Sequence, residues 1–436
     1  MTEIATQLPE IDTHYRGPLL AMEASFLAHQ KEIEAWFRQS WIKTPPPFYA
    51  SVDLRNAGYK LAPVDTNLFP AGFNNLNPAF TPMCVQALQA AFEHVCPMAR
   101  GALLIPERHT RNLFYLESVA ALAELFELAG FDVRVGSLDA APGEIDRRIL
   151  PSGRELSLHP IERHGDRLMA DGFSPCAIVL NNDLSGGIPP ILDNIEQTII
   201  PPMALGWWNR RKSVHFSHYQ DITHEFAERI GIDSWLLNPL FADCGEIDFL
   251  KREGEDCLAE QVERLLTQIA EKYAEHGIDQ EPFVVVKADS GTYGMGVMTA
   301  RSAADVIGLN RKQRTRMTAS KEGLSISRVI IQEGVHSFET MSRDHHVAEP
   351  VIYMIDRYVI GGFYRVHTER DVDENLNAPG AHFVPMSFAE SCVTPNATMG
   401  PDACPNRLYA YGVVARLALL AAAREVADVT ATGRIA

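Results

Sequence analysis

One segment constrains the fold of this chain more than any other: an apolar strand that leads directly into a glycine-rich loop. Residues 284–287 read Val-Val-Val-Lys, and Gly291, Gly294 and Gly296 follow within nine residues. The apolar run predicts a buried strand. Glycines let backbone N–H groups close around phosphate oxygens, and Lys287 adds a positive charge at the strand end. The spacing matches neither GxxxxGK[ST] nor GxGxxG, so a plain strand with a glycine-rich turn stays the alternative.

Composition narrows the class of protein. The 436 residues suggest two or three domains at roughly 150 residues each, and 46% hydrophobic with 22% charged residues is ordinary globular usage. A net charge of −17 argues against nucleic acid as a partner. The seven cysteines form no CxxC pair, so we expect reduced thiols in a cytoplasmic protein. The start lacks signal-peptide features and no run approaches the ~18 apolar residues of a membrane span, so we expect no membrane association.

The first half of the chain predicts an α/β domain. Apolar residues 102–105, a helical pattern over 116–129 and a strand at 131–135 form a β-α-β unit. A further buried strand at 177–180 leads into the polar loop 181–187. Loops at the carboxyl ends of such strands are where open α/β sheets bind ligands.

The remaining segments are predicted by the same periodicities. The predicted helices cover residues 19–41, 82–96, 258–273 and 407–426, and the predicted strands cover 283–286, 328–331, 351–355 and 358–365, the last two as a hairpin.

Several polar residues around the glycine-rich loop are candidates for nucleotide binding. Lys212 precedes a predicted helix, and Gln332-Glu333 ends a strand whose exit can present a carboxylate and backbone groups to an adenine amino group. Arg365 lies on a strand, followed by the polar loop 373–380. If each of these features is considered alone, a solvated basic patch or a solvated turn also explains it.

In this order, over roughly residues 207 to 380, these pieces resemble the ATP-grasp ligases. The resemblance implies two phosphate-binding lysines, a covering loop, a hinge for adenine, and an arginine that stabilises an acylphosphate. The implied nucleotide-binding residues are Lys212, Lys287, Gly291, Thr292, Tyr293, Gly294, Gly296, Gln332, Glu333, Val335, Asn375 and Asn377, with Arg365 and Lys287 as catalytic residues.

The magnesium ligands that many ATP-grasp enzymes carry near their C-terminus have no counterpart there. Instead, Asp65-Thr66-Asn67 near the N-terminus, preceded by Arg55, resembles the circularly permuted arrangement of eukaryotic-type glutathione synthetases. Residues i and i+2 on a strand share a face, so Asp65 and Asn67 can offer two oxygens to one Mg²⁺. The resemblance implies Asp289 as third ligand and a substrate carboxylate on Arg55. The alternative is an Asx-type turn before Pro70.

Over nearly its whole length the chain resembles the proteobacterial ATP-grasp-like glutamate–cysteine ligases, through residues 63–76, 287–296 and 374–380. The resemblance implies a mixed α/β, circularly permuted ATP-grasp-like fold, with an α/β substrate domain over 1–200 and a nucleotide-binding region over 201–436. It implies Mg²⁺, and ATP, glutamate and cysteine as substrates; a homo-oligomer is allowed. The alternatives are another amide ligase, such as glutathione synthetase, and a non-catalytic nucleotide-binding regulator.

Overall fold

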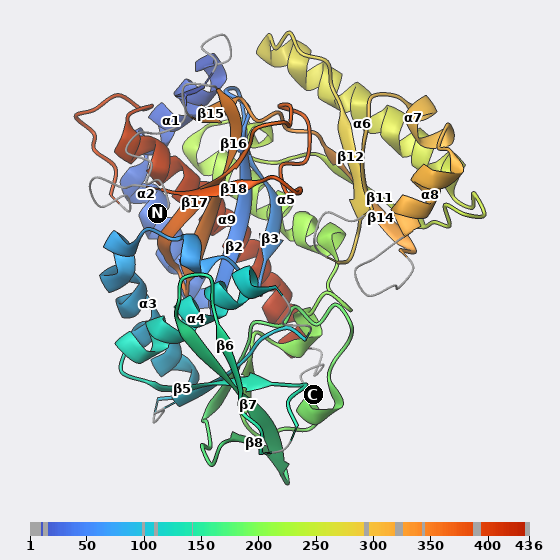
Figure 1. The fold of residues 1–436 in the computed structure, drawn as a ribbon. Helices are drawn as coiled ribbons and strands as arrows, with labels where there is room; N and C mark the ends of the chain where they lie inside the picture. The colour runs from blue at the N-terminus through green and yellow to red at the C-terminus, as the bar shows by residue number, and fades with distance from the viewer. Residues whose placement is uncertain are drawn as a thin grey trace.

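The computed structural model describes residues 10–11, 16–97, 101–108, 112–141, 143–291, 296–318, 326–341, 345–386 and 394–431. Within these residues the strands form three sheets, flanked by helices (Figure 1). The predicted mixed α/β class is confirmed. The helices are α1 (Arg16–Ala28), α2 (Gln30–Lys43), α3 (Thr81–Val95), α4 (Leu113–Leu128), α5 (Lys212–Ile230), α6 (Glu255–His276), α7 (Ala303–Ile307), α8 (Arg311–Thr318) and α9 (Cys404–Ala431).

The central sheet is antiparallel and joins strands from both ends of the sequence. Its members are β1 (Glu10–Ile11), β2 (Tyr49–Asn56), β3 (Leu61–Asn67), β15 (Glu339–Met341), β16 (His346–Ile355), β17 (Tyr358–His367) and β18 (His382–Pro385). The early strand β2 pairs with the second half of β16, with Asp53 opposite Val351. This union of early and late strands agrees with the permuted arrangement. The β16–β17 hairpin turns at Asp356-Arg357, as predicted.

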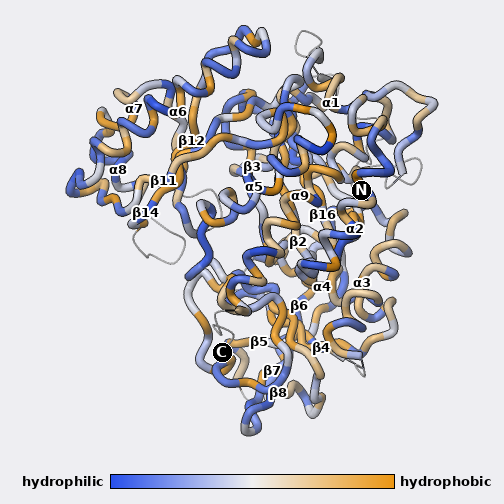
Figure 2. Tube along the Cα trace, turned by 180° about the vertical axis from the view of Figure 1, so that it is seen from behind, coloured by the Kyte–Doolittle hydropathy of each residue, from blue (hydrophilic) through white to orange (hydrophobic). Residues whose placement is uncertain are grey.

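The second sheet is largely parallel and contains the predicted β-α-β unit. Its strands are β4 (Gly101–Ile105), β5 (Asp132–Ser137), β6 (Asp146–Ile149), β7 (Glu155–His164), β8 (Arg167–Ala170), β9 (Ala177–Leu180) and β10 (Thr198–Ile200). Strands β10, β9, β4, β5 and β7 run parallel. Helix α4 connects β4 to β5, and apolar residues concentrate along the strands (Figure 2). Strand β9 ends at the polar loop that was predicted to follow it.

The third sheet is antiparallel and carries the glycine-rich segment. It has the order β11-β14-β12-β13, formed by β11 (Phe241–Glu246), β12 (Val284–Ala288), β13 (Val297–Ala300) and β14 (Arg328–Glu333). Helix α6 packs against β11, β14 and β12, with α7 and α8 beside it (Figure 1).

The helices at the two ends of the chain form much of the core. The single helix expected over residues 19–41 is two helices, because His29 leaves helical geometry with φ −103° and ψ 13°. Helix α9 is longer than predicted and buried almost all round, since it packs against α1, α5, β2, β3 and β16. No helix in the described ranges is long and apolar enough to span a membrane.

Candidate active site

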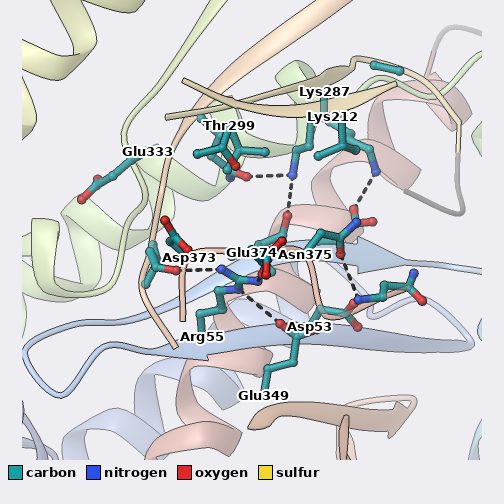
Figure 3. A pocket seen from close by; sticks show the side chains of 18 of the residues that line it. Asp53, Arg55, Lys212, Lys287, Thr299, Glu333, Glu349, Asp373, Glu374 and Asn375 are labelled. Carbon is teal, nitrogen blue, oxygen red and sulfur yellow. Dashed lines mark hydrogen bonds and ion pairs between the residues drawn. The ribbon is translucent and has the colours of Figure 1, made fainter. Parts of the chain in front are cut away.

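A pocket lies between the central sheet and the third sheet (Figure 3). Strands β2, β3, β16 and β17 supply one wall, and β12, β13 and β14 supply the other. Its lining includes many of the residues singled out from the sequence: Arg55, Asp65, Lys212, Lys287, Gly291, Gln332, Glu333, Val335, Arg365, Asn375 and Asn377. The fold therefore gathers into one cavity side chains from Arg55 to Asn377, which lie more than 300 residues apart in the sequence.

Lys287 reaches from β12 across the cavity to the opposite sheet. Its Nζ donates to the Val64 carbonyl at 2.7 Å and to Gln332 Oε1 at 2.7 Å. Both acceptors are neutral, and no carboxylate in the described part of the chain is in direct contact with the ammonium group. Burial lowers the pKa of Lys287 to about 7, although Asp65 favours the charged form. An anion entering the pocket would find a fixed donor whose charge is not yet neutralised.

Lys212 is the first residue of α5 and lies beside Asp65. Its Nζ donates to Asp65 Oδ1 at 2.7 Å and lies 4.0 Å from the centre of the Trp207 ring. The start of α5 is fixed by Asp289, whose carboxylate accepts the backbone N–H of Ser213 at 2.8 Å and its hydroxyl at 2.9 Å. Asp289 thus satisfies free N–H groups of the helix terminus. Asp289 is fully buried and lines neither the first nor the second pocket.

Asp65 and Asp53 face each other across the β2–β3 pair. They are direct partners in the strand register, so their side chains share one face of the sheet. Burial favours neutral Asp65, but the ammonium groups of Lys212 and Lys287 hold its pKa well below the ordinary value. Asn67 is on the same strand, and its Oδ1 accepts the Phe69 backbone N–H at 2.9 Å. The Asx-type turn considered for this segment is therefore present at Asn67.

Arg365 lies on β17 between two carboxylates. It donates to Asp53 Oδ2 at 2.9 Å and to Glu349 Oε1. Glu349 also accepts Arg55 Nε at 3.2 Å. Arg55 donates further to the carbonyls of Val335, at 3.0 Å, and of Glu374. The structure thus places Arg55 in the first pocket, where it ties the exit of β14 to the loop after β17.

The two residues that end β14 point to opposite sides of their sheet. Gln332 turns into the pocket and holds Lys287, whereas the carboxylate of Glu333 points away from it (Figure 3). Glu333 accepts Lys60 Nζ at 2.7 Å, the Leu240 backbone N–H at 2.8 Å and Trp235 Nε1 at 3.1 Å. The predicted carboxylate–adenine contact is therefore not available to Glu333, and only its backbone borders the cavity.

The loops around the cavity are partly described. Gly291 lines the pocket and has φ +99°, in the left-handed region that favours glycine. Gly296 also has positive φ, 63°, and a Cβ there would lie 2.5 Å from Ile326 Cδ1. On the other side, Asn375 and Asn377 line the cavity and are joined by a side-chain to backbone hydrogen bond of 2.9 Å. The predicted residues Thr292, Tyr293 and Gly294 lie outside the described residues.

A second pocket adjoins the first, between the central sheet and the parallel sheet. Asp53, Asp65, Arg365 and Asn377 line both pockets. The remaining wall combines polar side chains with an aromatic surface. The polar side chains are Ser51, Asn67, Asn74, Asn75, Glu107, Asn112, Tyr115, Ser118, Asn181, Asp183 and His382. Asn181 and Asp183 belong to the polar loop 181–187, which follows a buried strand at the position where open α/β sheets bind ligands.

Sequence considerations did not identify Asp53 and Glu349. Both are acids within otherwise buried strands, and both bind Arg365. The available signal for Asp53 was its strand position, because it is two residues before Arg55 and therefore shares its face. Glu349 carries no comparable signal, because its partners come from β2 and β17.

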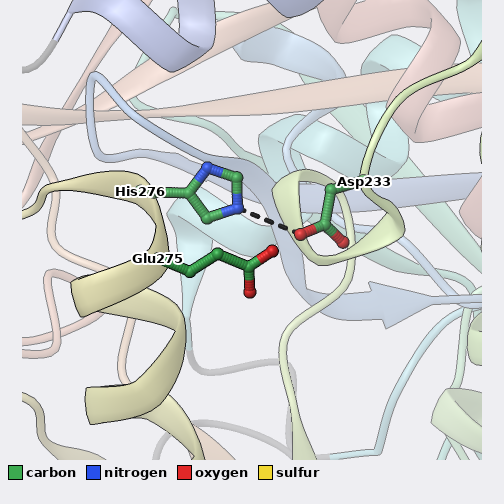
Figure 4. Close-up of side chains that lie close together, drawn as sticks. All are labelled: Asp233, Glu275 and His276. Atoms are coloured by element: carbon green, nitrogen blue, oxygen red, sulfur yellow. Dashed lines mark hydrogen bonds and ion pairs between the residues drawn. The ribbon is translucent and has the colours of Figure 1, made fainter.

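One cluster outside the pockets has the composition of a metal site. Donor atoms of Asp233, Glu275 and His276 lie within 4.8 Å of one another (Figure 4). Lys272, however, donates to Asp233 Oδ2 and to Glu275 Oε2, both at 2.8 Å. An ammonium group thus supplies the positive charge. Burial raises the pKa of Asp233, but hydrogen bonds from Lys272, the Trp235 backbone and His276 outweigh it and lower the pKa to about 2. We assign this cluster to the structure of α6 and its neighbours.

The mixed α/β architecture places a pocket that carries two lysines between two antiparallel sheets. The glutamate–cysteine ligase family model matches residues 23–426. Since this match covers most of the chain, the chain belongs to the glutamate–cysteine ligase family and is a ligase.

One solved structure agrees with this assignment. A Methylobacillus flagellatus KT protein provisionally named gamma-glutamylcysteine synthetase shares 57% identity over 97% of this chain and 100% of its own, with a TM-score of 0.91. D-alanyl-alanine synthetase A from Vibrio cholerae is 12% identical over 73% of this chain and 82% of its own, with a TM-score of 0.33. A glutathione synthetase-like effector from Globodera pallida is 10% identical over 84% and 85%, with a TM-score of 0.36. The last two are too distant to carry an argument, and no curated protein matches.

Proposed function

We propose that this chain joins the γ-carboxylate of L-glutamate to the amine of L-cysteine, with ATP as co-substrate. The terminal phosphoryl group of ATP is transferred to the γ-carboxylate, giving an acylphosphate and ADP. The cysteine amine then attacks the acyl carbon, phosphate leaves, and the amine loses a proton, so that the product is γ-glutamylcysteine. This is the first step of glutathione biosynthesis, and it requires no nucleophile from the enzyme.

The observation that carries this proposal is the junction of the two pockets. The first pocket holds the lysines, and the second is rich in amide and carboxylate side chains. Asp53, Asp65 and Arg365 line both. A phosphoryl group passed from a nucleotide in one pocket to a carboxylate in the other would therefore cross this junction.

Catalysis of phosphoryl transfer rests on positioning and charge neutralisation, and the lysines and acids of the pockets would have different roles in it. Lys212 and Lys287 would hold the phosphates of ATP. The donor set for Mg²⁺ is Asp65 with Asp53, because their carboxylates are direct register partners and oxygen donors are those that Mg²⁺ prefers. Asp65 Oδ2 has no protein partner within the described part of the chain. Asn67 keeps one lone pair for the ion. The ion would supply positive charge for the phosphate oxygens.

Arg365 would bind the acylphosphate and the oxyanion that forms when the amine attacks. Its Nε is buried and has no hydrogen-bond partner among the described residues, so a donor is left for a ligand. Asp53 and Glu349 fix the guanidinium in place. We retain Gln332, Glu333 and Val335 as the adenine hinge, with backbone groups as the contacts. Arg55 would bind a substrate carboxylate only after releasing part of its present contacts.

The test is product analysis with the purified protein. ADP release is measured with ATP and Mg²⁺ plus glutamate alone, glutamate with cysteine, or γ-glutamylcysteine with glycine, and products are identified by mass. We expect ADP and γ-glutamylcysteine to form in equal amounts only when glutamate and cysteine are both present. Turnover with the glycine mixture would instead assign a glutathione synthetase. ATP binding without turnover in any mixture would favour a nucleotide-binding regulator.

A further inference from the structure

The second pocket has an aromatic floor that the ligation chemistry described above does not use. We define this aromatic floor as Tyr353 on β16, Phe363 on β17 and Phe383 on β18. Ring centroids are 5.5 Å apart for Tyr353 and Phe363 and 5.0 Å apart for Phe363 and Phe383. The Tyr353 hydroxyl donates to the Ala71 carbonyl, so its polar end is already bonded. Phe383 is 37% exposed, whereas Tyr353 and Phe363 are 2% and 3% exposed, so the apolar surface that the floor offers inside the polar pocket comes mainly from Phe383 and the other two rings support it.

The strand register places this floor next to the reacting groups. Asp65, Asp53, Val351 and Phe363 follow one another across the sheet as successive register partners. Along β17, Phe363 and Arg365 are two residues apart, so they share a face at a separation of about 6.6 Å. Phe383 is the register partner of Arg365 on the next strand. A substrate whose reacting atom lies at Arg365 thus has the Phe383 ring within reach of a short side chain, and the buried Phe363 ring packs against Phe383 from below.

This geometry suits one of the two amino-acid substrates better than the other. Glutamate is polar at both ends, and its γ-carboxylate must lie at the junction of the pockets. In cysteine only Cα and Cβ separate the attacking nitrogen from the sulfur. Sulfur makes favourable contacts with aromatic rings. When the amine approaches the acyl carbon at Arg365, the thiol can reach the neighbouring rings while the carboxylate faces the polar wall.

Resting on the proposed function, we propose that the aromatic floor is the subsite for the acceptor side chain and selects a small apolar or sulfur-bearing group. Phe363 and Phe383 are then specificity-determining residues. Such a site accepts L-2-aminobutyrate, which carries a methyl group in place of the thiol. It rejects L-serine by roughly 10²-fold, because an apolar pocket discriminates against an added hydroxyl only to about that extent.

The test is a competition assay with the full-length protein, ATP, Mg²⁺ and glutamate. Pairs of acceptors, cysteine with serine and cysteine with 2-aminobutyrate, compete in one reaction, and the product ratio is read by mass. This ratio reports relative kcat/KM and does not depend on how much of a variant is folded. Phe383→Ala removes a ring that is already 37% exposed, and Phe363→Leu keeps the volume apolar but removes the aromatic face. Tyr358→Leu, on the same strand but outside both pockets, is the matched control.

We expect the wild type and Tyr358→Leu to prefer cysteine over serine by roughly 10²-fold. Phe383→Ala should reduce this preference about tenfold, and Phe363→Leu should shift the cysteine to 2-aminobutyrate ratio several-fold toward 2-aminobutyrate, while KM for ATP and glutamate is unchanged. Unchanged ratios in both variants would overturn the subsite while leaving the ligase standing. No glutamate-dependent product in the wild type with any acceptor would overturn the proposed function, and the subsite with it.

Discussion

Two lysines lie on opposite sides of β14, and the protein partners them differently. Lys287 faces the first pocket and is held by two neutral acceptors, the Gln332 amide and the Val64 carbonyl. Lys60 is fully buried behind the strand and is held by the Glu333 carboxylate at 2.7 Å. The residues that make this difference are adjacent in sequence and alternate between the two faces of one strand.

The comparison shows how a strand can fix a cation without neutralising it. A carboxylate partner compensates the charge of Lys60, which suits a buried group with no ligand to bind. An amide and a carbonyl fix the position of Lys287 but leave its charge for a phosphate. Burial lowers the pKa of both lysines, to about 8 for Lys60 and about 7 for Lys287. The role of each lysine therefore follows from its partner more than from its burial.

The largest effect should come from breaking the ion pair between Lys60 and Glu333. Lys60→Met leaves the Glu333 carboxylate buried without its cation, so we expect the free energy of unfolding to fall by roughly 3 to 5 kcal/mol. The midpoint of urea denaturation, followed by tryptophan fluorescence, measures this. In Lys60→Met/Glu333→Leu the charge is absent, and the double variant should recover much of the loss. A double variant as unstable as the single one would show that the pair is not the source of the effect.

Removing Lys287 should instead weaken ATP binding and leave the stability of the fold unchanged. Lys287→Ala deletes a phosphate donor, and loss of one such contact typically costs about 10²- to 10³-fold in rate. We expect ATP affinity by calorimetry and kcat/KM to fall sharply, while the denaturation midpoint stays within error of the wild type. Unchanged ATP affinity would remove Lys287 from the nucleotide site.

Much of the fold followed from sequence periodicity. The β-α-β unit, the strand at residues 177–180 and the β16–β17 hairpin have strong patterns with clear breaks, and their positions were predicted closely. The break between α1 and α2 at His29 was missed because no glycine or proline marks it. The division of the chain near residue 200 stays a prediction, and the pairing of β2 with β16 shows why sequence order is a poor guide to it.

The site was predictable only where a motif existed. Lys212, Lys287, Asp65 and Arg365 lie together as the resemblance implied. The direction of Glu333 was not predictable, because residues 329–333 are all buried and no polar alternation identifies the pocket face. Asp289 was singled out by its position after Lys287, yet its carboxylate binds the start of α5. Contacts made across three sheets leave no local signature in the sequence.

Replacing the side-chain amide of Gln332 with a carboxylate would give Lys287 the same kind of partner that Lys60 has. Gln332→Glu places a carboxylate on Lys287, so the ammonium is neutralised before ATP arrives and the new charge repels phosphate. We expect KM for ATP to rise about tenfold, equivalent to about 1.4 kcal/mol, with KM for glutamate and cysteine unchanged. Gln332→Met is the matched control: it loses the hydrogen bond without adding charge. A larger effect for Gln332→Met than for Gln332→Glu would contradict the electrostatic explanation.

The smallest expected effect is the uptake of protons when ATP binds. Because the pKa of Lys287 is lowered to about 7 in the free protein, the lysine is partly neutral just above neutral pH. A bound triphosphate favours the charged form and raises that pKa. ATP binding at pH 8 should therefore take up a fraction of a proton, and affinity should fall as pH rises from 7 toward the pKa of the complex. Calorimetry in buffers of different ionisation enthalpy measures the uptake.

Two variants serve as controls for this proton uptake. Lys287→Met should abolish the uptake, whereas Lys60→Met/Glu333→Leu should keep it, since the charge behind β14 has no part in binding. If Lys287→Met takes up as much proton as the wild type, the proton binds to another group. The proposal that neutral partners leave the charge of Lys287 for phosphate would then be contradicted.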